Sequence, residues 1–421
     1  MSRSSFLRRG ILVLWAALWA SPGTASAQQT LTWDQVRERF IAQNPTVLAG
    51  RLGVDETRAQ AITASLRPNP TLTVAFDQID LVTTHPFDPF VNLLWVTSVS
   101  YLHERDQKRE LRQDTAHQAT AIAVVSQTDL ERTLLFTVRT AFIGILQAKA
   151  TSTLARDNLA AYDQSLGVQR ARLAAGDIAQ VDLDRLELQR FQLESDLQTA
   201  DTNLRTAKIQ LVALLNDRTP IDQFDVTGPF DYAETPRTLD ELRQTALATR
   251  PDLQAAQQSV AKAKTDHQLA LANGSIDPTF GFDVGRNPPL QHYVGVNVSV
   301  PLRVFDRNQG EKLRTEIDVE KEQRMLDATQ AQILNDVDSA YATLVGALTV
   351  LRPYKTQYLP QAAKVRDTVT FSFQNGGASL LDFLDAQRAY RDVQVSYVNL
   401  IGSYLTAVNQ LNLALGREEI R

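Results

Sequence analysis

One pattern of residues occurs twice in this chain, about 200 positions apart. Residues 173–187 read LAAGDIAQVDLDRLE, and residues 373–387 read FQNGGASLLDFLDAQ. Gly176 aligns with Gly376 and Asp182 with Asp382, both at an offset of 200. A glycine at a tip of small residues, with an aspartate six positions later, is typical of a tight turn followed by a helix start. The chain is therefore expected to contain two copies of one helical hairpin.

The duplication extends along most of the chain. LTWDQVRERFIAQNPTVLAG (31–50) aligns with RTLDELRQTALATRPDLQAA (237–256) at an offset of 206, and NPTLTVAFD (69–77) aligns with DPTFGFDVG (277–285) at an offset of 208. Residues 28–216 and 237–421 are thus predicted to be two structural repeats. Residues 217–236 are rich in Asp, Thr, Gly and Pro, a composition typical of a linker.

Each repeat is predicted to begin with one helix and to continue into a pair of strands. Thr32 and Thr238 are the expected N-caps of the two first helices. Hydrophobic residues then alternate with polar ones, which is typical of a strand with one apolar face. This alternation predicts β-hairpins at 70–101 (strands 70–80 and 91–101) and at 278–301 (strands 278–286 and 291–301), with proline-bearing loops.

Long helices are expected after both strand pairs. Residues 106 to about 173 and 307 to about 374 are predicted to be helical, with Pro353 and Pro360 expected to kink or divide the second stretch. After each turn a second helix returns. Mostly hydrophobic residues recur every seven positions in the returning helices, in register with Leu183 in the first repeat and Phe383 in the second. This seam predicts antiparallel coiled-coil hairpins over 106–216 and 307–416.

The first 27 residues are predicted to be a secretory signal peptide. Arginines at 3, 8 and 9 form a basic region, residues 11–20 are apolar, and residues 25–27 read ASA, a cleavage site before Gln28. The apolar run is too short for a membrane anchor, and no later run approaches the roughly 18 residues of a membrane helix. An exported chain without cysteine has neither a disulfide framework nor a lipid-modified cysteine.

Composition and motifs give no support for an enzyme, a cofactor, a metal site or a nucleic-acid-binding surface. The net charge of −5 is spread along the chain, so there is no basic stripe for nucleic acid. The five histidines form no zinc motif, and neither a nucleophile elbow nor a P-loop occurs. Methionine occurs only at positions 1 and 325 and there is no His-rich tract, so the sequence has no methionine-rich copper relay.

The strand pairs favour a membrane β-barrel that several copies of the chain share. Each strand has about 10 residues, enough to cross an outer membrane at a tilt. A sheet in a bilayer must close to pair its edges, but four strands are fewer than the about eight of the smallest barrels. The alternative is a soluble sheet packed on the helices, which strands this short leave open.

The sequence resembles the TolC-type outer-membrane factors, the exit ducts of tripartite efflux pumps and type I secretion systems. The resemblance rests on the duplication, the strand pairs, the two Gly-x5-Asp turns and the coiled-coil hairpins, and it covers essentially the whole mature chain. PLRVFDRNQGEKLR (301–314) is similar to the strand-to-helix junction of the CzcC-like, heavy-metal-efflux branch. The resemblance implies a mainly α-helical fold with a membrane β-barrel. It implies a homotrimer whose shared twelve-stranded barrel stands on an α-helical coiled-coil tunnel.

The same resemblance implies a function and partners. The chain would be an outer-membrane channel of a Gram-negative bacterium with a periplasmic extension. It would passively conduct metal ions or drugs delivered by a periplasmic adaptor (a membrane fusion protein) and an inner-membrane transporter of RND type. Outer-membrane lipid would surround it. The alternative is a non-conducting periplasmic coiled-coil scaffold or an adaptor subunit. The sequence leaves the cargo, the pump class and the gating trigger open.

Acidic site residues are carried over from the family. A ring of aspartates lines the periplasmic constriction of such channels, and Asp382 and Asp385 match its spacing from Gly376, with Asp182 as the counterpart in the first repeat. Several such carboxylates around one axis would attract cations and raise some of their own pKa values. The alternative is that these are helix-start carboxylates favoured by the helix dipole.

The turns themselves are the expected adaptor-docking sites, because the small residues Ala175, Gly176, Gly376, Gly377 and Ala378 allow helices to approach closely. The alternative is an ordinary helical-hairpin turn that needs glycine for positive φ. The family's latch between neighbouring hairpins uses a tyrosine three positions before this second glycine and an arginine two positions after it. Here Phe373 and Ala378 occupy those positions, so a closed state would have to be held differently.

Overall fold

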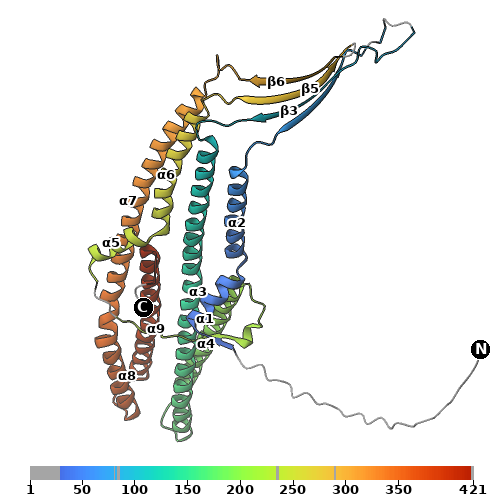
Figure 1. The fold of residues 1–421 in the computed structure, drawn as a ribbon. Helices are drawn as coiled ribbons and strands as arrows, with labels where there is room; N and C mark the ends of the chain where they lie inside the picture. Colours follow the sequence, from blue (N-terminus) through green and yellow to red (C-terminus); the bar gives the residue numbers. More distant parts are fainter. Residues whose placement is uncertain (1–28, 80, 83–85, 234–236, 289–290, 419–421) are drawn as a thin grey trace, which may run out of the picture.

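The computed structural model describes residues 29–79, 81–82, 86–233, 237–288 and 291–418. The predicted signal peptide, residues 1–27, lies outside the described residues. The molecule is elongated, with a small sheet at one end and two helical hairpins that reach to the other end (Figure 1). The prediction of a mainly helical chain with long helices and a small antiparallel sheet is confirmed.

The same order of elements occurs twice. The first series is α1 (Trp33–Gln43), α2 (Pro45–Ser65), β2 (Thr71–Asp77), β3 (Leu94–Leu102), α3 (Lys108–Ala174) and α4 (Gln180–Leu214). The second series is α5 (Leu239–Thr249), α6 (Pro251–Ala272), β5 (Thr279–Asn287), β6 (Gln291–Ser299), α7 (Gln309–Pro353), the π-helical turn η2 (Tyr354–Tyr358), α8 (Leu359–Gln374) and α9 (Leu380–Leu415). The repeat boundaries themselves stay an interpretation of the sequence.

The first helix of each series begins at its predicted cap and then breaks at a proline. Thr32 and Thr238 are the N-caps of α1 and α5, as the sequence predicts. One continuous helix was wrong, however, because Pro45 and Pro251 each start a second helix. A proline forces the preceding residue out of the helical region, and the residues before these two prolines have ψ of 123° and 124°.

The four long strands form one antiparallel sheet in the order β2-β3-β5-β6. The central pair, β3 with β5, joins the two series of elements. Within the described residues, β2 and β6 are the two edges of this sheet. One edge strand therefore comes from the first series of elements and the other from the second.

The long helices differ in continuity. Helix α3 runs unbroken for 67 residues, about 100 Å at 1.5 Å per residue. In the second series, Pro353 ends α7, and Pro360 lies in the first turn of α8, with the π-helical turn η2 between them. The expectation that these prolines divide the helix is confirmed, since a proline removes a helical hydrogen bond and crowds the preceding turn.

Residues 217–236, predicted as a linker, carry ordered elements between positions 221 and 226. The 3-10 helix η1 (Ile221–Gln223) leads into β4 (Phe224–Val226), which pairs in parallel with β1 (Gln29–Leu31). Phe224 and Val226 are buried against α1, α3 and α4. This core lies midway along the molecule, at the level where α1 and α5 lie beside the long helices (Figure 1). We call this level the equator.

The helices form an open row rather than a closed bundle. Between the sheet and the equator, α2 packs on α3, α3 on α6 and α6 on α7; below the equator, α4 packs on α3, α3 on α9, and α9 on α7 and α8. Figure 1 shows this order from α7 across to α2. In the part of the chain that the structure describes, no helix carries a stretch long and apolar enough to cross a membrane.

Heptad positions of the returning helices are buried, as the sequence predicts. In α4, Leu183, Leu186 and Leu193 face the first hairpin's core, and in α9, Tyr404 and Leu411 face a larger core with α5 and α7. The pairs α3·α4 and α8·α9 thus form two coiled-coil hairpins whose turns lie at the end remote from the sheet (Figure 1).

Candidate functional site: the hairpin turns and the strand sheet

Both hairpin turns are closed by a glycine in the left-handed region. Gly176 has φ of +82° and Gly376 has φ of +79°. The N–H of Gly176 donates to the carbonyl of Leu173 at 2.9 Å, and the N–H of Gly376 donates to the carbonyl of Phe373 at 3.2 Å. Any side chain with a Cβ would be strained there. Backbone geometry alone therefore accounts for glycine at both positions.

The remaining turn residues are small for different reasons. A Cβ at Gly377 would come within 2.8 Å of Ser372 Oγ, so Ser372 of the same hairpin leaves little room for a side chain at this position. Ala175 is the exposed C-cap of α3, and Ala378 is half-buried before the start of α9. No Cβ contact restricts the space around Gly176 or Gly376, so both turn tips are open.

Asp382 is part of a capping box at the start of α9. Its carboxylate accepts a hydrogen bond from Ser379 Oγ at 2.6 Å and one from the Ser379 backbone N–H at 3.0 Å, while its own N–H donates to Ser379 Oγ at 3.2 Å. These bonds from Ser379 lower the pKa of Asp382 below its ordinary value. Within one chain, Asp382 thus has the geometry of a helix-start carboxylate, and a raised pKa in an assembled ring stays a prediction.

The other two predicted acidic residues have different surroundings. Asp182 occupies the same position at the start of α4, but its Oδ1 lies 3.7 Å from Nη1 of Arg185. Asp385, which aligns with Arg185, lies exposed one turn after Asp382. Both helix starts therefore carry two carboxylates, but only α4 has an arginine among them: Arg185 lies beside Asp182, and Asp184 accepts a hydrogen bond from Gln180.

An aromatic cluster joins the two hairpins near their turns. Phe373 stacks on Phe383 with ring centroids 4.8 Å apart and an interplanar angle of 20°. Phe383 is buried in the core of the first hairpin with Tyr162 and Leu183. The Arg172 guanidinium carbon lies 5.8 Å from the Phe373 ring centroid, close enough for a cation–π contact from α3. Sequence reasoning missed Arg172, since nothing local marks a contact 201 residues away (373 − 172).

The two faces of the sheet differ in chemistry. Residues that are cross-strand partners point to the same face of the sheet. On one face they form two rows across β2, β3, β5 and β6: Leu72–Val99–Phe282–Val296 and Val74–Thr97–Val284–Val294. Most of these apolar side chains are exposed, Val296 by 84 %. The opposite face carries the rows Thr71–Ser100–Gly281–Asn297 and Thr73–Ser98–Asp283–Gly295. An uncovered apolar face opposite a polar one is the pattern of a strand between lipid and water.

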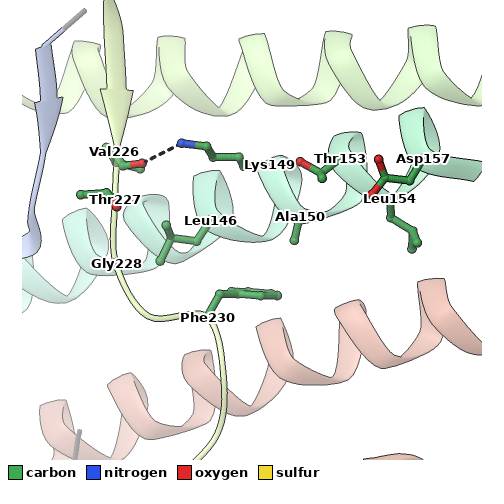
Figure 2. Close-up of a pocket in the computed structure, with 10 residues that line it drawn as sticks. All are labelled: Leu146, Lys149, Ala150, Thr153, Leu154, Asp157, Val226, Thr227, Gly228 and Phe230. Carbon is green, nitrogen blue, oxygen red and sulfur yellow. Dashed lines mark hydrogen bonds between the residues drawn. The ribbon is translucent and has the colours of Figure 1, made fainter. Parts of the chain in front are cut away.

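A groove at the equator is large enough for a small molecule, but its chemistry argues against a binding site. It has a volume of about 430 Å³ and lies between α3 and the segment after β4 (Figure 2). Its one amine, Lys149, is engaged by Asp225 at 2.5 Å and by the carbonyl of Val226 at 3.3 Å. Among the described residues, no group of three or more His, Asp or Glu side chains could hold a metal ion.

Comparison with known proteins agrees with this geometry. Residues 242–417 match the family profile named "Outer membrane efflux protein". The cobalt-zinc-cadmium resistance protein CzcC of Cupriavidus metallidurans is 24% identical over 397 residues, which cover 92% of this chain and 90% of CzcC. This chain matches the outer membrane efflux protein family over its second half and resembles CzcC over most of its length.

A second relative agrees in sequence, and a solved channel structure agrees in fold. The outer membrane protein TolC of Vibrio cholerae is 22% identical over 316 residues, which cover 72% of each chain. The open-state structure of the MtrE outer membrane channel of Neisseria gonorrhoeae superposes with a TM-score of 0.75 at 16% identity, over 92% of this chain and 90% of MtrE. The profile and these relatives indicate an outer-membrane efflux channel with a periplasmic part rather than an enzyme.

Proposed function

We propose that three copies of this chain form one exit channel of a tripartite efflux system. The observation that carries the proposal is that the molecule is open at the same two edges along its whole length. One edge consists of β2, α2 and α4, all from the first series of elements. The other consists of β6, α7 and α8, all from the second series.

The open edges expose apolar side chains that a single chain leaves in water. Leu52 and Ile62 are exposed on α2, as are Leu188 and Phe191 on α4. On the other edge, exposed apolar residues of α7 and α8 include Leu313, Ile317 and Phe371. Joining one edge to the opposite edge of the next copy would bury both sets, and such head-to-tail contacts generate a ring when the rotation closes.

The same joining would close the sheet. If β6 of one copy pairs with β2 of the next, all neighbours stay antiparallel, and three copies give twelve strands around one barrel (3 × 4). A closed barrel leaves no unpaired strand edge in the membrane. The apolar rows would then face lipid and the polar rows the lumen. The number three follows from the resemblance to TolC-type channels.

The far end of the helical tunnel would be the constriction. Three copies of Asp382 and Asp385 would place six carboxylates (3 × 2) near one axis, with Asp182 offset by Arg185. Such a ring attracts cations and can be blocked by multivalent ones. The turn tips are open at Gly176 and Gly376. This supports docking at the turns, which also comprise Ala175, Gly377 and Ala378, of a periplasmic adaptor that delivers cargo from an inner-membrane transporter of RND type.

The name of CzcC, a cobalt-zinc-cadmium resistance protein, supports divalent metal ions as the cargo. The junction at residues 301–314 points the same way. In this proposal residues 1–27 are removed on export. The first structural repeat is 28–216, the equatorial linker is 217–236, and the second repeat is 237–421.

A planar-bilayer experiment tests the channel and its constriction together. Detergent-purified protein is inserted into a planar lipid bilayer, and the trivalent cation cobalt hexaammine is added on the periplasmic side of the channel. We expect steady currents that the trivalent ion blocks, and loss of the block in Asp382→Asn/Asp385→Asn. Asp182→Asn is the matched control and should retain the block, because Arg185 already offsets that carboxylate. Currents that ignore the trivalent ion would exclude the acidic ring, whereas failure of membrane-inserted protein to conduct would favour a scaffold.

A further inference from the structure

One carboxylate stands in the middle of the polar face of the sheet. Asp283 is the central residue of β5, four residues from either end of the strand (Thr279–Asn287). The described residues of β2, β3, β5 and β6 include two other charged side chains, Asp77 and Arg286. Asp77 ends β2, and Arg286 is next to the last residue of β5. Among the described residues of these four strands, Asp283 is thus the one Asp, Glu, Lys or Arg that lies at the middle of a strand.

The neighbours of Asp283 leave its carboxylate projecting from the sheet. Its cross-strand partners are Ser98 in β3 and Gly295 in β6. The next residues of β5 on the same face are Gly281 and Gly285. The residues next to Asp283 on this face are therefore glycines and a serine, which are too small to cover its carboxylate.

Two longer side chains of β6 flank the carboxylate. Asn297 lies over Gly281, where a Cβ would come within 2.5 Å of Asn297 Oδ1, and its Nδ2 donates to Asp283 Oδ2 at 2.8 Å. Tyr293 lies over Gly285, where a Cβ would come within 2.8 Å of the Tyr293 hydroxyl. The two glycines thus make room for Asn297 and Tyr293 on either side of Asp283, and Asn297 fixes the carboxylate.

We infer that Asp283 is a second determinant of ion selectivity, inside the barrel and separate from the aspartates at the hairpin turns. The inference rests on the proposed function, because it requires the polar face to line the lumen. In a threefold assembly Asp283 would recur three times at one depth. A mid-strand charge is far less costly in a water-filled lumen than against lipid, which supports the same orientation.

The expected effect follows from electrostatics. A unit charge about 10 Å from an ion in water changes the local ion concentration about twofold at low salt. Three such charges acting together would give about eightfold before screening, and salt at about 0.1 M reduces this because the Debye length is then about 10 Å. Screening at this distance lowers the combined cation enrichment to about twofold. Because anions are depleted by the same factor, a change of about two- to eightfold in the cation-to-anion permeability ratio is expected when Asp283 is neutralised.

The test is a reversal-potential measurement with potassium chloride at two concentrations, on channels that already carry Asp382→Asn/Asp385→Asn. Adding Asp283→Asn, which keeps the side-chain shape, should lower the permeability ratio of K⁺ to Cl⁻ two- to eightfold. Adding Asp283→Ser, which matches the neighbouring serines, should do the same. Asp222→Asn is the matched control, because Asp222 is exposed at the equator and pairs with Arg205. It should leave the ratio unchanged.

The outcomes separate the two proposals. If the Asp283 variants conduct with the same permeability ratio as the Asp222 control, the inference fails and the channel stands. If the assembled parent protein inserts into the bilayer and passes no current, the channel proposal fails and this inference fails with it.

Discussion

The aromatic cluster between the hairpins gives the sharpest prediction about the turn end of the molecule. Phe383 is 3% exposed, stacks on Phe373 at 4.8 Å and lies in the core of the first hairpin. Truncating a buried phenylalanine to alanine costs about 3–5 kcal/mol. The lost stacking adds about 0.5–1.5 kcal/mol. Because the cluster lies far from the equatorial and sheet cores, we expect the loss to appear as local opening of the hairpins.

Hydrogen exchange followed by mass spectrometry measures this directly. A loss of about 3 kcal/mol corresponds to roughly a hundredfold faster exchange wherever opening is local. In Phe383→Ala, the amides of both hairpin ends should exchange faster, while those of the equator stay unchanged. Leu381→Ala is the matched control, since Leu381 is 68% exposed and lies near the same turn, on α9 rather than on an open edge. Equal exchange in the two variants would refute the claim that this cluster holds the hairpins together.

Three further predictions concern the turn and the equator. Gly376 has a φ of +79°, so Gly376→Ala should destabilise the second turn by about 1–2 kcal/mol and Gly376→Asn by less. Equal hydrogen exchange of the turn amides in wild type and both variants would contradict this. Arg250 is 5% exposed and pairs with Asp252 and Asp336 at 2.6 and 2.9 Å. Arg250→Met should therefore lower the free energy of chemical unfolding by up to about 3–5 kcal/mol, and by less to the extent that the two aspartates are exposed. Arg58→Met, which changes an exposed arginine, should lower it by almost nothing. Burial alone would raise the pKa of Asp225, but the hydrogen bond from Lys149 and the charge of Lys208 lower this pKa below its ordinary value. The ionised Asp225 therefore stabilises the fold above the unfolded-state pKa of about 3.9. This stabilisation is lost as the pH falls through the lower folded-state pKa. The difference in thermal unfolding between wild type and Asp225→Asn should therefore shrink below about pH 4, and a difference that persists at lower pH would argue against these ion pairs.

The sequence predicts those elements whose signal is local and periodic. Alternating residues mark the strands because one face is apolar, and heptads mark α4 and α9 because the seam is buried. The break at Pro353 follows from the chemistry of proline. The split of the first helices at Pro45 and Pro251 was open to the same reasoning, since both prolines follow a residue driven into extended backbone.

Other features depend on contacts between distant segments. Strands β1 and β4 have three residues each, too few for a period to be recognised, and they form because Phe224 and Val226 pack into the equatorial core. The Arg172–Phe373 contact joins two separate hairpins, so no spacing within either one reveals it. The aspartates were found through a family resemblance, and the structure adds that Asp382 also caps its own helix.

The most direct test of the central claim is the mass of the detergent-solubilised protein, measured by native mass spectrometry after purification from outer membranes. The account predicts a particle of three processed chains, because the open edges of the sheet and helices are completed by neighbouring copies. A stable particle of one chain would contradict it, since the apolar residues of α2, α4, α7 and α8 would then remain in contact with solvent or detergent.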